Sequence, residues 1–146
     1  MDLSLLSPYI IAIAAGWLIA HAIKYVVSRV RGEKLQSPEV YLFRSGGMPS
    51  AHTTTAFALL TVIGLVDGAG TGLFGLALLF TVIVMNDAVR VRRSSGEQGI
   101  TIRKLVKELK SKIPLPRAAL GHTPMEVILG AVLGVVIGLV VFLATR

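Results

Sequence analysis

The chain has 146 residues and a formal net charge of +7, and 53% of its residues are hydrophobic. This length suits one domain, and the mean hydropathy of +0.74 favours an integral membrane protein over a soluble one. The absence of cysteine excludes disulfides and thiol ligands. Because the basic residues lie between apolar segments, the positive charge indicates membrane topology and anionic phospholipid headgroups as partners, and no nucleic acid.

Residues 8–29 form the first predicted span, since about 20 apolar residues are needed to cross a bilayer. His21 and Lys24 are three residues apart and share a helix face. We expect Lys24 to extend to the membrane interface and His21 to face neighbouring helices. A catalytic role for His21 is a minor alternative.

A glycine-rich stretch, residues 45–55, leads into the second predicted span at about residues 49–66. Glycines let the backbone turn tightly and bring N–H groups close to a ligand. Pro49 suits the first turn of a helix, where free N–H groups favour an anion. His52 would stand in that turn and exchange protons near neutral pH. The predicted phosphate ligands are Gly46, Gly47 and Ser50. The alternative is a plain glycine turn before a helix.

The third predicted span, at about residues 73–89, follows a short turn without basic residues. Residues 94–99 are predicted to break the helix. Beyond them, apolar residues at helical spacing with basic residues between them predict an interfacial amphipathic helix at about residues 101–113, on the cytoplasmic membrane surface. A solvated helix packed on the domain is the alternative.

His122 directly precedes the fourth predicted span, at about residues 124–144. Thr123 and Glu126 have the spacing of a capping box, and Glu126 can instead accept the ring N–H of His122. Glycines four residues apart form a smooth stripe in this span, which lets another helix approach closely, within the chain or in a homodimer. The stripe comprises Gly130, Gly134 and Gly138.

These elements predict an all-α integral membrane protein with four transmembrane helices and one interfacial helix, forming a single domain over residues 1–146. Nearly all basic residues lie in the two connections that precede His52 and His122. The positive-inside rule therefore places both connections in the cytoplasm and both termini outside, in a multi-pass protein of the cell membrane. The two histidines are thus predicted to begin separate helices at one membrane face.

Two histidines at one face permit phosphoryl transfer from a membrane lipid phosphate at headgroup level. One attacks phosphorus while the other protonates the leaving oxygen, and cations stabilise the equatorial oxygens. The candidate cations are Arg92, Arg93 and Arg117, with Lys34 and Arg44 next. Asp87 is predicted to pair with Arg90 or to bind cations of the site. No cofactor is expected; a divalent metal stays open, although no metal-ligand spacing is present.

Three segments resemble a known family. Pro49-Ser50-Ala51-His52 resembles the Pro-Ser-Gly-His element of the type 2 phosphatidic acid phosphatase superfamily, which includes the vanadium haloperoxidases. Residues 45–52, 87–96 and 120–127 together are similar to its small divergent branch. The resemblance implies metal-independent dephosphorylation of lipid phosphates or diphosphates. The roles that it implies are general acid for His52, nucleophile for His122 and acidic partner for Glu126.

The sequence departs from the superfamily pattern in its basic residues. No Lys-x6-Arg-Pro element is present, because Lys34 and Arg44 are wrongly spaced, and only four residues separate Arg117 from His122. Arg92 and Arg93 are therefore expected to take part in phosphate binding. Four spans where the superfamily has six predict a minimal core that can need a second copy.

The sequence thus predicts a membrane hydrolase, a lipid phosphatase of phospholipid metabolism that works through a phosphohistidine. One alternative is a non-catalytic protein that binds anionic lipid headgroups in a phosphate cradle. Another is a structural membrane protein.

Overall fold

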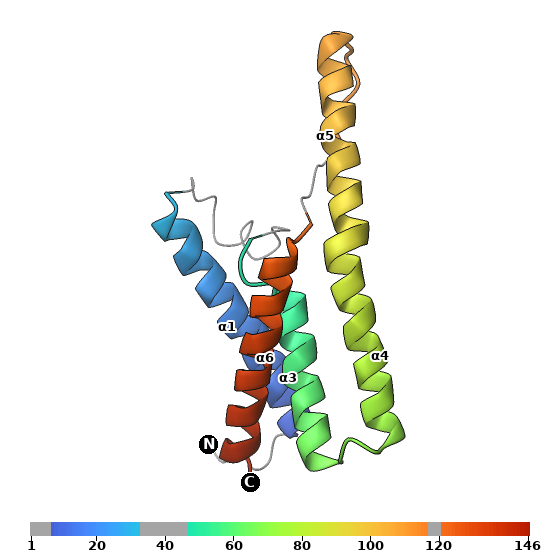
Figure 1. The fold of residues 1–146 in the computed structure, drawn as a ribbon. Coiled ribbons are helices and arrows are strands. Elements are labelled where there is room, and N and C mark those ends of the chain that lie inside the picture. Colours follow the sequence, from blue (N-terminus) through green and yellow to red (C-terminus); the bar gives the residue numbers. More distant parts are fainter. Residues whose placement is uncertain (1–6, 33–46, 117–120) are drawn as a thin grey trace.

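The computed structural model describes residues 7–32, 47–116 and 121–146. These residues form α1 (Pro8–Val30), α3 (Ala51–Val66), α4 (Gly72–Asn86), the π-helical turn η2 (Asp87–Val91), α5 (Arg92–Glu108) and α6 (Pro124–Ala144) (Figure 1). The described residues contain no strand. The predicted all-α fold is confirmed.

Three described helices are long and apolar enough to cross a membrane: α1, the continuous helix Gly72–Glu108, and α6. The fourth apolar helix, α3, has only 16 residues. It is about 24 Å long, against a hydrocarbon core of about 30 Å. α3 packs against α1, α4 and α6 and so forms the centre of the bundle. These lengths and compositions agree with the predicted membrane protein.

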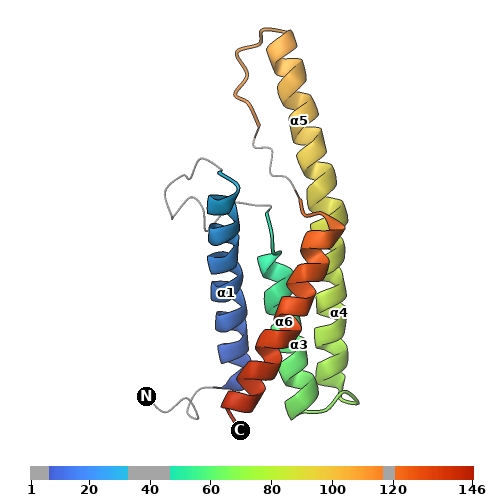
Figure 2. The ribbon, with the colours of Figure 1, turned by 60° about the vertical axis from the view of Figure 1, so that its left-hand side comes forward.

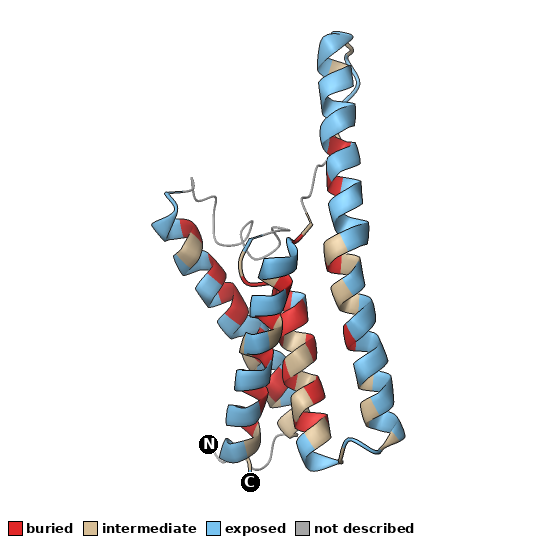
Figure 3. Ribbon diagram, viewed as in Figure 1, coloured by how far each residue is buried: buried red, intermediate tan, exposed pale blue. Residues whose placement is uncertain are grey.

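Alanines and branched aliphatic side chains form the interior of the bundle, and many other large apolar side chains are exposed. Figure 3 shows the buried positions gathered where α1, α3 and α6 meet. The core cluster consists of Ala12, Ala58, Val62, Ile137 and Val141. On α4, by contrast, only Thr81 is buried. Lipid tails are as apolar as leucine or phenylalanine, so helices in a membrane associate through small residues that allow close packing.

The glycine stripe of α6 is buried against α3 of the same chain. A Cβ at Gly130 would lie 2.8 Å from the backbone oxygen of Ser50, and one at Gly134 would lie 2.6 Å from Cβ of Phe57. A Cβ at Gly138 would meet the side chain of Thr61. Of the two predicted uses of the stripe, the structure shows packing within the chain. The homodimer stays a prediction, and through these glycines it would have to displace α3.

The predicted helix break at residues 94–99 is wrong. These residues lie inside α5, and the helix is continuous from Gly72 to Glu108. Side-chain pairs one turn apart offset the two glycines of this segment: Arg93 with Glu97 at 3.2 Å, and Gln98 with Ser94 at 3.2 Å. The prediction from composition therefore underestimated the tendency of residues 94–99 to form a helix.

The segment predicted to lie on the membrane surface instead continues the direction of α4. Figures 1 and 2 both show α4 and α5 as one rod that extends beyond the other helices. The helix ends at Glu108, earlier than the predicted residue 113, and Lys110 has a left-handed backbone with φ of 49°. Because no break separates α5 from α4, α5 does not turn across the bundle.

Close approach at the glycine stripe leads to a stability prediction. Gly134→Leu should lower the free energy of unfolding by about 1–3 kcal/mol or more, because the new side chain would force α6 away from α3. The measurement is urea or dodecyl-sulfate unfolding of the purified protein in micelles.

Gly75→Ala is the matched control, because a Cβ at this glycine of α4 would have no neighbour within 4 Å. It should leave stability unchanged or raise it by up to about 1 kcal/mol through helix propensity. Equal effects of the two substitutions would contradict the packing argument.

Candidate active site

The segment before α6 is attached to the π-turn η2 through its main chain. The N–H of His122 donates to the carbonyl oxygen of Ala88 at 3.0 Å. Gly121 allows this approach, because a Cβ there would lie 2.7 Å from Cα of Arg93. These two backbone contacts therefore fix the position of the His122 main chain relative to η2 and the start of α5.

Glu126 performs both of its predicted alternative roles at once. Its Oε2 accepts the N–H of Thr123 at 3.0 Å, and Oγ1 of Thr123 accepts the N–H of Glu126 at 3.3 Å, which completes a capping box. The same Oε2 lies 3.1 Å from Nδ1 of His122. A carboxylate only accepts, so Nδ1 carries the proton and Nε2 has the free lone pair.

His122 is buried, with 6% of its surface exposed. Burial lowers its pKa below the ordinary value; the hydrogen bond and charge of Glu126 oppose this, and the charges of Lys24 and Arg92 add to it. The balance is a lowered pKa, so the imidazole is neutral near pH 7. A neutral ring whose tautomer is set by a carboxylate has the state that a nucleophile requires.

Ser50 joins the starts of α3 and α6. It is the N-cap residue of α3, and its N–H donates to the carbonyl oxygen of Glu126 at 3.1 Å. Its hydroxyl is fully buried and forms a hydrogen bond with Oγ1 of Thr53 at 2.9 Å. The structure therefore places this hydroxyl inside the bundle, where it connects helices; its predicted role as a phosphate ligand stays a prediction.

His52 lies in the first turn of α3, at the end of the bundle where α6 begins. Its imidazole is exposed and within electrostatic reach of Arg92, His122, His21 and Lys24. The structure thus brings the two candidate histidines to one end of the bundle, from helices far apart in the sequence. His21 is buried on α1, with Nδ1 2.8 Å from the carbonyl oxygen of Trp17.

Arg92 and Arg93 are the described arginines among those predicted to bind phosphate, and only Arg92 is within electrostatic reach of both histidines. Its charge acts on both of them, and its Nε donates to Oδ2 of Asp87 at 2.5 Å. Arg93 points to Glu97 instead, and both of those side chains are more than half exposed, at 51% and 65%. The two arginines are therefore not equivalent.

The pairing of Asp87 with Arg92 differs from the predicted pairing with Arg90. Residues five apart are about 140° apart around an α-helix and cannot meet. Here η2 replaces the α-helical turn, with the N–H of Arg92 bonded to the carbonyl oxygen of Asp87. The wider turn brings the two side chains to one face. Such π-turns are frequent at functional sites and give no clear sequence signal.

Sequence reasoning missed Lys24, and its predicted extension to the interface is wrong. Its residue surface is only 5% exposed, and its charge acts on both His52 and His122. Its chain lies over Gly47, which has φ of 88° and whose Cβ, if present, would be 3.1 Å from Cε of Lys24. The sequence does contain a signal, because Lys24 continues a row of small residues spaced four apart along α1. The structure shows this row buried: Ala12, Gly16, Ala20, Lys24 and Ser28.

Several predicted site residues fall outside the described ranges. They are Lys34, Arg44, Gly46 and Arg117. Within the residues that the structure describes, no group of three or more histidine or acidic side chains could hold a metal ion.

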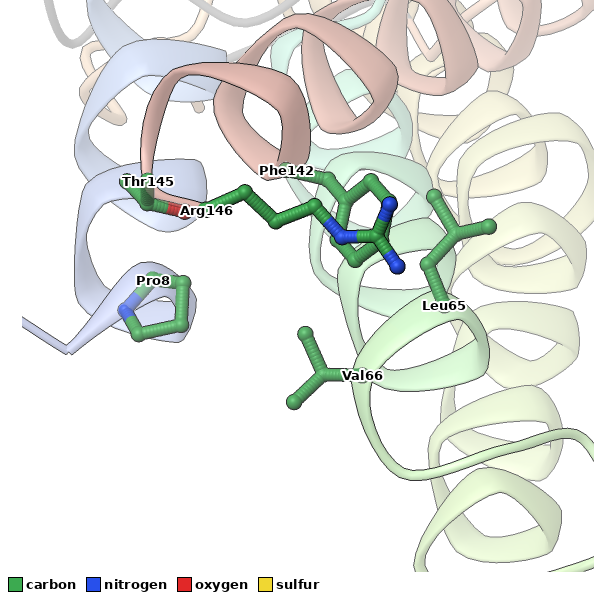
Figure 4. A pocket seen from close by; sticks show the side chains of 6 residues that line it. All are labelled: Pro8, Leu65, Val66, Phe142, Thr145 and Arg146. Atoms are coloured by element: carbon green, nitrogen blue, oxygen red, sulfur yellow. The ribbon is translucent and has the colours of Figure 1, made fainter.

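A cavity of about 310 Å³ lies at the opposite end of the bundle (Figure 4). It is lined by Pro8, Leu65, Val66, Phe142, Thr145 and Arg146. The start of α1 and the ends of α3 and α6 therefore meet there, away from the histidines. This places the two ends of the described chain on one side of the bundle.

Comparison with known proteins gives one family and one curated relative. The family described as the divergent PAP2 family matches residues 6–137. The chain is 35% identical over 136 residues to the uncharacterized membrane protein YuiD of Bacillus subtilis, with 83% of this chain and 82% of YuiD covered. No solved structure matches the chain.

The carboxylate of Glu126 should influence the titration of His122. Glu126→Gln removes the charge that favours the imidazolium, so the pKa of His122 should fall further below its ordinary value. The measurement is a pH titration of ¹⁵N-histidine-labelled protein in micelles, followed by NMR of the ring nitrogens. Glu97→Gln on α5 is the control and should leave this pKa in place, because Glu97 pairs with Arg93. A raised or unchanged pKa in Glu126→Gln would contradict the assigned contact.

Proposed function

This chain belongs to the divergent PAP2 family, and on that premise we propose that it is a membrane phosphatase that hydrolyses a phosphomonoester or diphosphate on a lipid. The observation that supports this most is the pair formed by the buried His122 and Glu126, beside a second histidine. Nδ1 of His122 is held by the carboxylate, which leaves Nε2 as the nucleophile.

In the proposed reaction, Nε2 of His122 attacks phosphorus and forms a P–N bond. The bond from phosphorus to the lipid oxygen breaks, and His52 donates the proton that this oxygen takes up. Water then attacks the phosphohistidine and gives a proton to His52. The P–N bond breaks, and inorganic phosphate leaves with His122 restored.

Charge near the site supports this sequence of steps. Phosphorylation of Nε2 makes the imidazole ring of His122 cationic, and the carboxylate of Glu126 stabilises that charge at 3.1 Å. Arg92, held by Asp87, is available for the equatorial oxygens of the phosphoryl group. The roles of Gly47, Ser50 and Arg93, and of the four candidates outside the described ranges, stay predictions from the sequence.

The location of the histidines supports a lipid substrate. They lie at the starts of the apolar helices α3 and α6, and helix ends of this kind are expected at the level of the lipid headgroups. We place this end in the cytoplasm because the basic connections adjoin it, and the ends of the described chain outside.

The chain has no cysteine, so its orientation can be tested by introducing one at a time. Thr145→Cys should react with a membrane-impermeant maleimide in intact cells, because the end of α6 faces outward. Lys107→Cys on α5 should react only after the membrane is permeabilised. Labelling in the reverse order would invert the proposed topology.

Phosphate release tests the proposed reaction. The purified protein should release phosphate from at least one member of a panel of phosphatidate, phosphatidylglycerol phosphate and polyprenyl phosphate. His122→Ala should abolish release, because the nucleophile is gone. His52→Ala should slow it by at least about 100-fold, the usual contribution of a general acid. Arg103→Gln, on the exposed surface of α5, is the control and should keep full activity.

A trapped intermediate separates the mechanism from its alternatives. Brief reaction with a labelled lipid phosphate should leave acid-labile phosphate on the wild-type protein and none on His122→Ala. Undiminished activity in His122→Ala would eliminate the mechanism. Lipid binding without turnover across the panel would instead favour the non-catalytic cradle for anionic headgroups.

A further inference from the structure

Lys24 is a buried cation on the one spanning helix to which the proposed reaction gives no role. We propose that its ammonium group binds the phosphoryl oxygens of the substrate, so that α1 also contributes a group to the site. This inference rests on the proposed function, because it concerns the same phosphate site. Its ligand is a terminal phosphoryl group on a lipid or free phosphate itself.

The first argument is the place of Lys24 in the helix interface. The buried row of α1 has small residues at Ala12, Gly16 and Ala20, where this helix packs closely on α3. A Cβ at Gly16 would lie 3.0 Å from Cα of Thr55. Towards the histidine end, α1 diverges from α6 in both views (Figures 1 and 2). Between the small residues Ala20 and Ser28 of this row, the buried side chain is the long, charged Lys24.

The second argument is what Lys24 contacts. Its side chain lies over Gly47, at the end of the glycine stretch that the sequence marks as a phosphate loop. With φ of 88°, Gly47 has a backbone conformation that other residues rarely adopt, and the missing Cβ leaves room for the lysine chain. The conformation of Gly47 and the position of the Lys24 side chain therefore depend on each other.

The third argument is electrostatic. Among the described residues, Lys24 on α1 and Arg92 at the start of α5 are the lysine and arginine whose charges act on both His52 and His122. Burying an ammonium group among apolar helices is costly, and ionisable residues inside membrane helices usually mark functional sites. Both positive charges therefore act at the place where the two histidines lie, and a dianionic phosphoryl group is the ligand that such a pair of cations favours.

Orthovanadate binding to the purified full-length protein tests the inference without requiring turnover. Vanadate copies the charge and geometry of a phosphoryl group under attack. Lys24→Met should weaken its binding by about 10- to 100-fold, the usual effect of losing one charge-assisted hydrogen bond. Lys24→Arg should recover part of the loss. Arg29→Met is the matched control, because it removes one charge from the exposed last turn of α1, and it should stay within about twofold of wild type.

The thermal midpoint of each variant distinguishes ligand binding from a structural role. It should be unchanged in Lys24→Met, and Lys24→Gln replaces this variant if it does not fold. Vanadate binding in Lys24→Met within twofold of wild type, or an equal loss in Arg29→Met, would overturn the inference, as would absence of vanadate binding by the wild type.

The outcomes also separate this inference from the proposed function. Vanadate binding that depends on Lys24, without hydrolysis of any lipid phosphate, would support the lysine site and refute the phosphatase. Phosphate release that is unaffected by Lys24→Met would support the phosphatase and refute the lysine site.

Discussion

The structure depends on the close approach of α6 to α3 along three glycines. At its upper end this contact brings the backbone of Ser50 against Gly130, and the N–H of Ser50 bonds to the carbonyl oxygen of Glu126. The starts of the two helices are thereby fixed to each other. Because His52 and His122 stand within a few residues of these starts, the packing of α6 against α3 determines the relative position of the two histidines at one end of the bundle.

Around this contact the remaining elements add charge. The carbonyl oxygen of Ala88 in the π-turn η2 accepts the N–H of His122, and Arg92 directly after η2 and Lys24 on α1 add positive charge that acts on both histidines. Glu126 balances part of this positive charge and fixes the tautomer of His122. The groups of the proposed phosphate site thus come from four elements that lie far apart in the sequence: α1, α3, the turn at η2 and the start of α6.

The sequence predicted the all-α fold, the four apolar helices and the location of His52 and His122 at one end of the bundle, because hydropathy and helix-start residues are local signals. The positions of the membrane spans stay predictions. The sequence did not predict the unbroken helix through residues 94–99, where side-chain pairs outweigh two glycines. The pairing of Asp87 with Arg92 needs a π-turn, which leaves no pattern. Lys24 was misplaced because a lysine near the end of an apolar helix usually extends to water, and only the spacing of small residues along α1 showed that it faces inward.

The histidine that begins α6 is positioned by main-chain atoms, through the bond to Ala88 and the contact of Gly121 with Arg93. Backbone carbonyl and amide groups occur in nearly every residue, so these contacts depend little on which side chains surround them. A larger side chain is excluded only where two backbones touch, as at Gly121. Substitutions across most of the bundle should therefore leave the imidazole of His122 in place, while a methyl group added at Gly121 would move it.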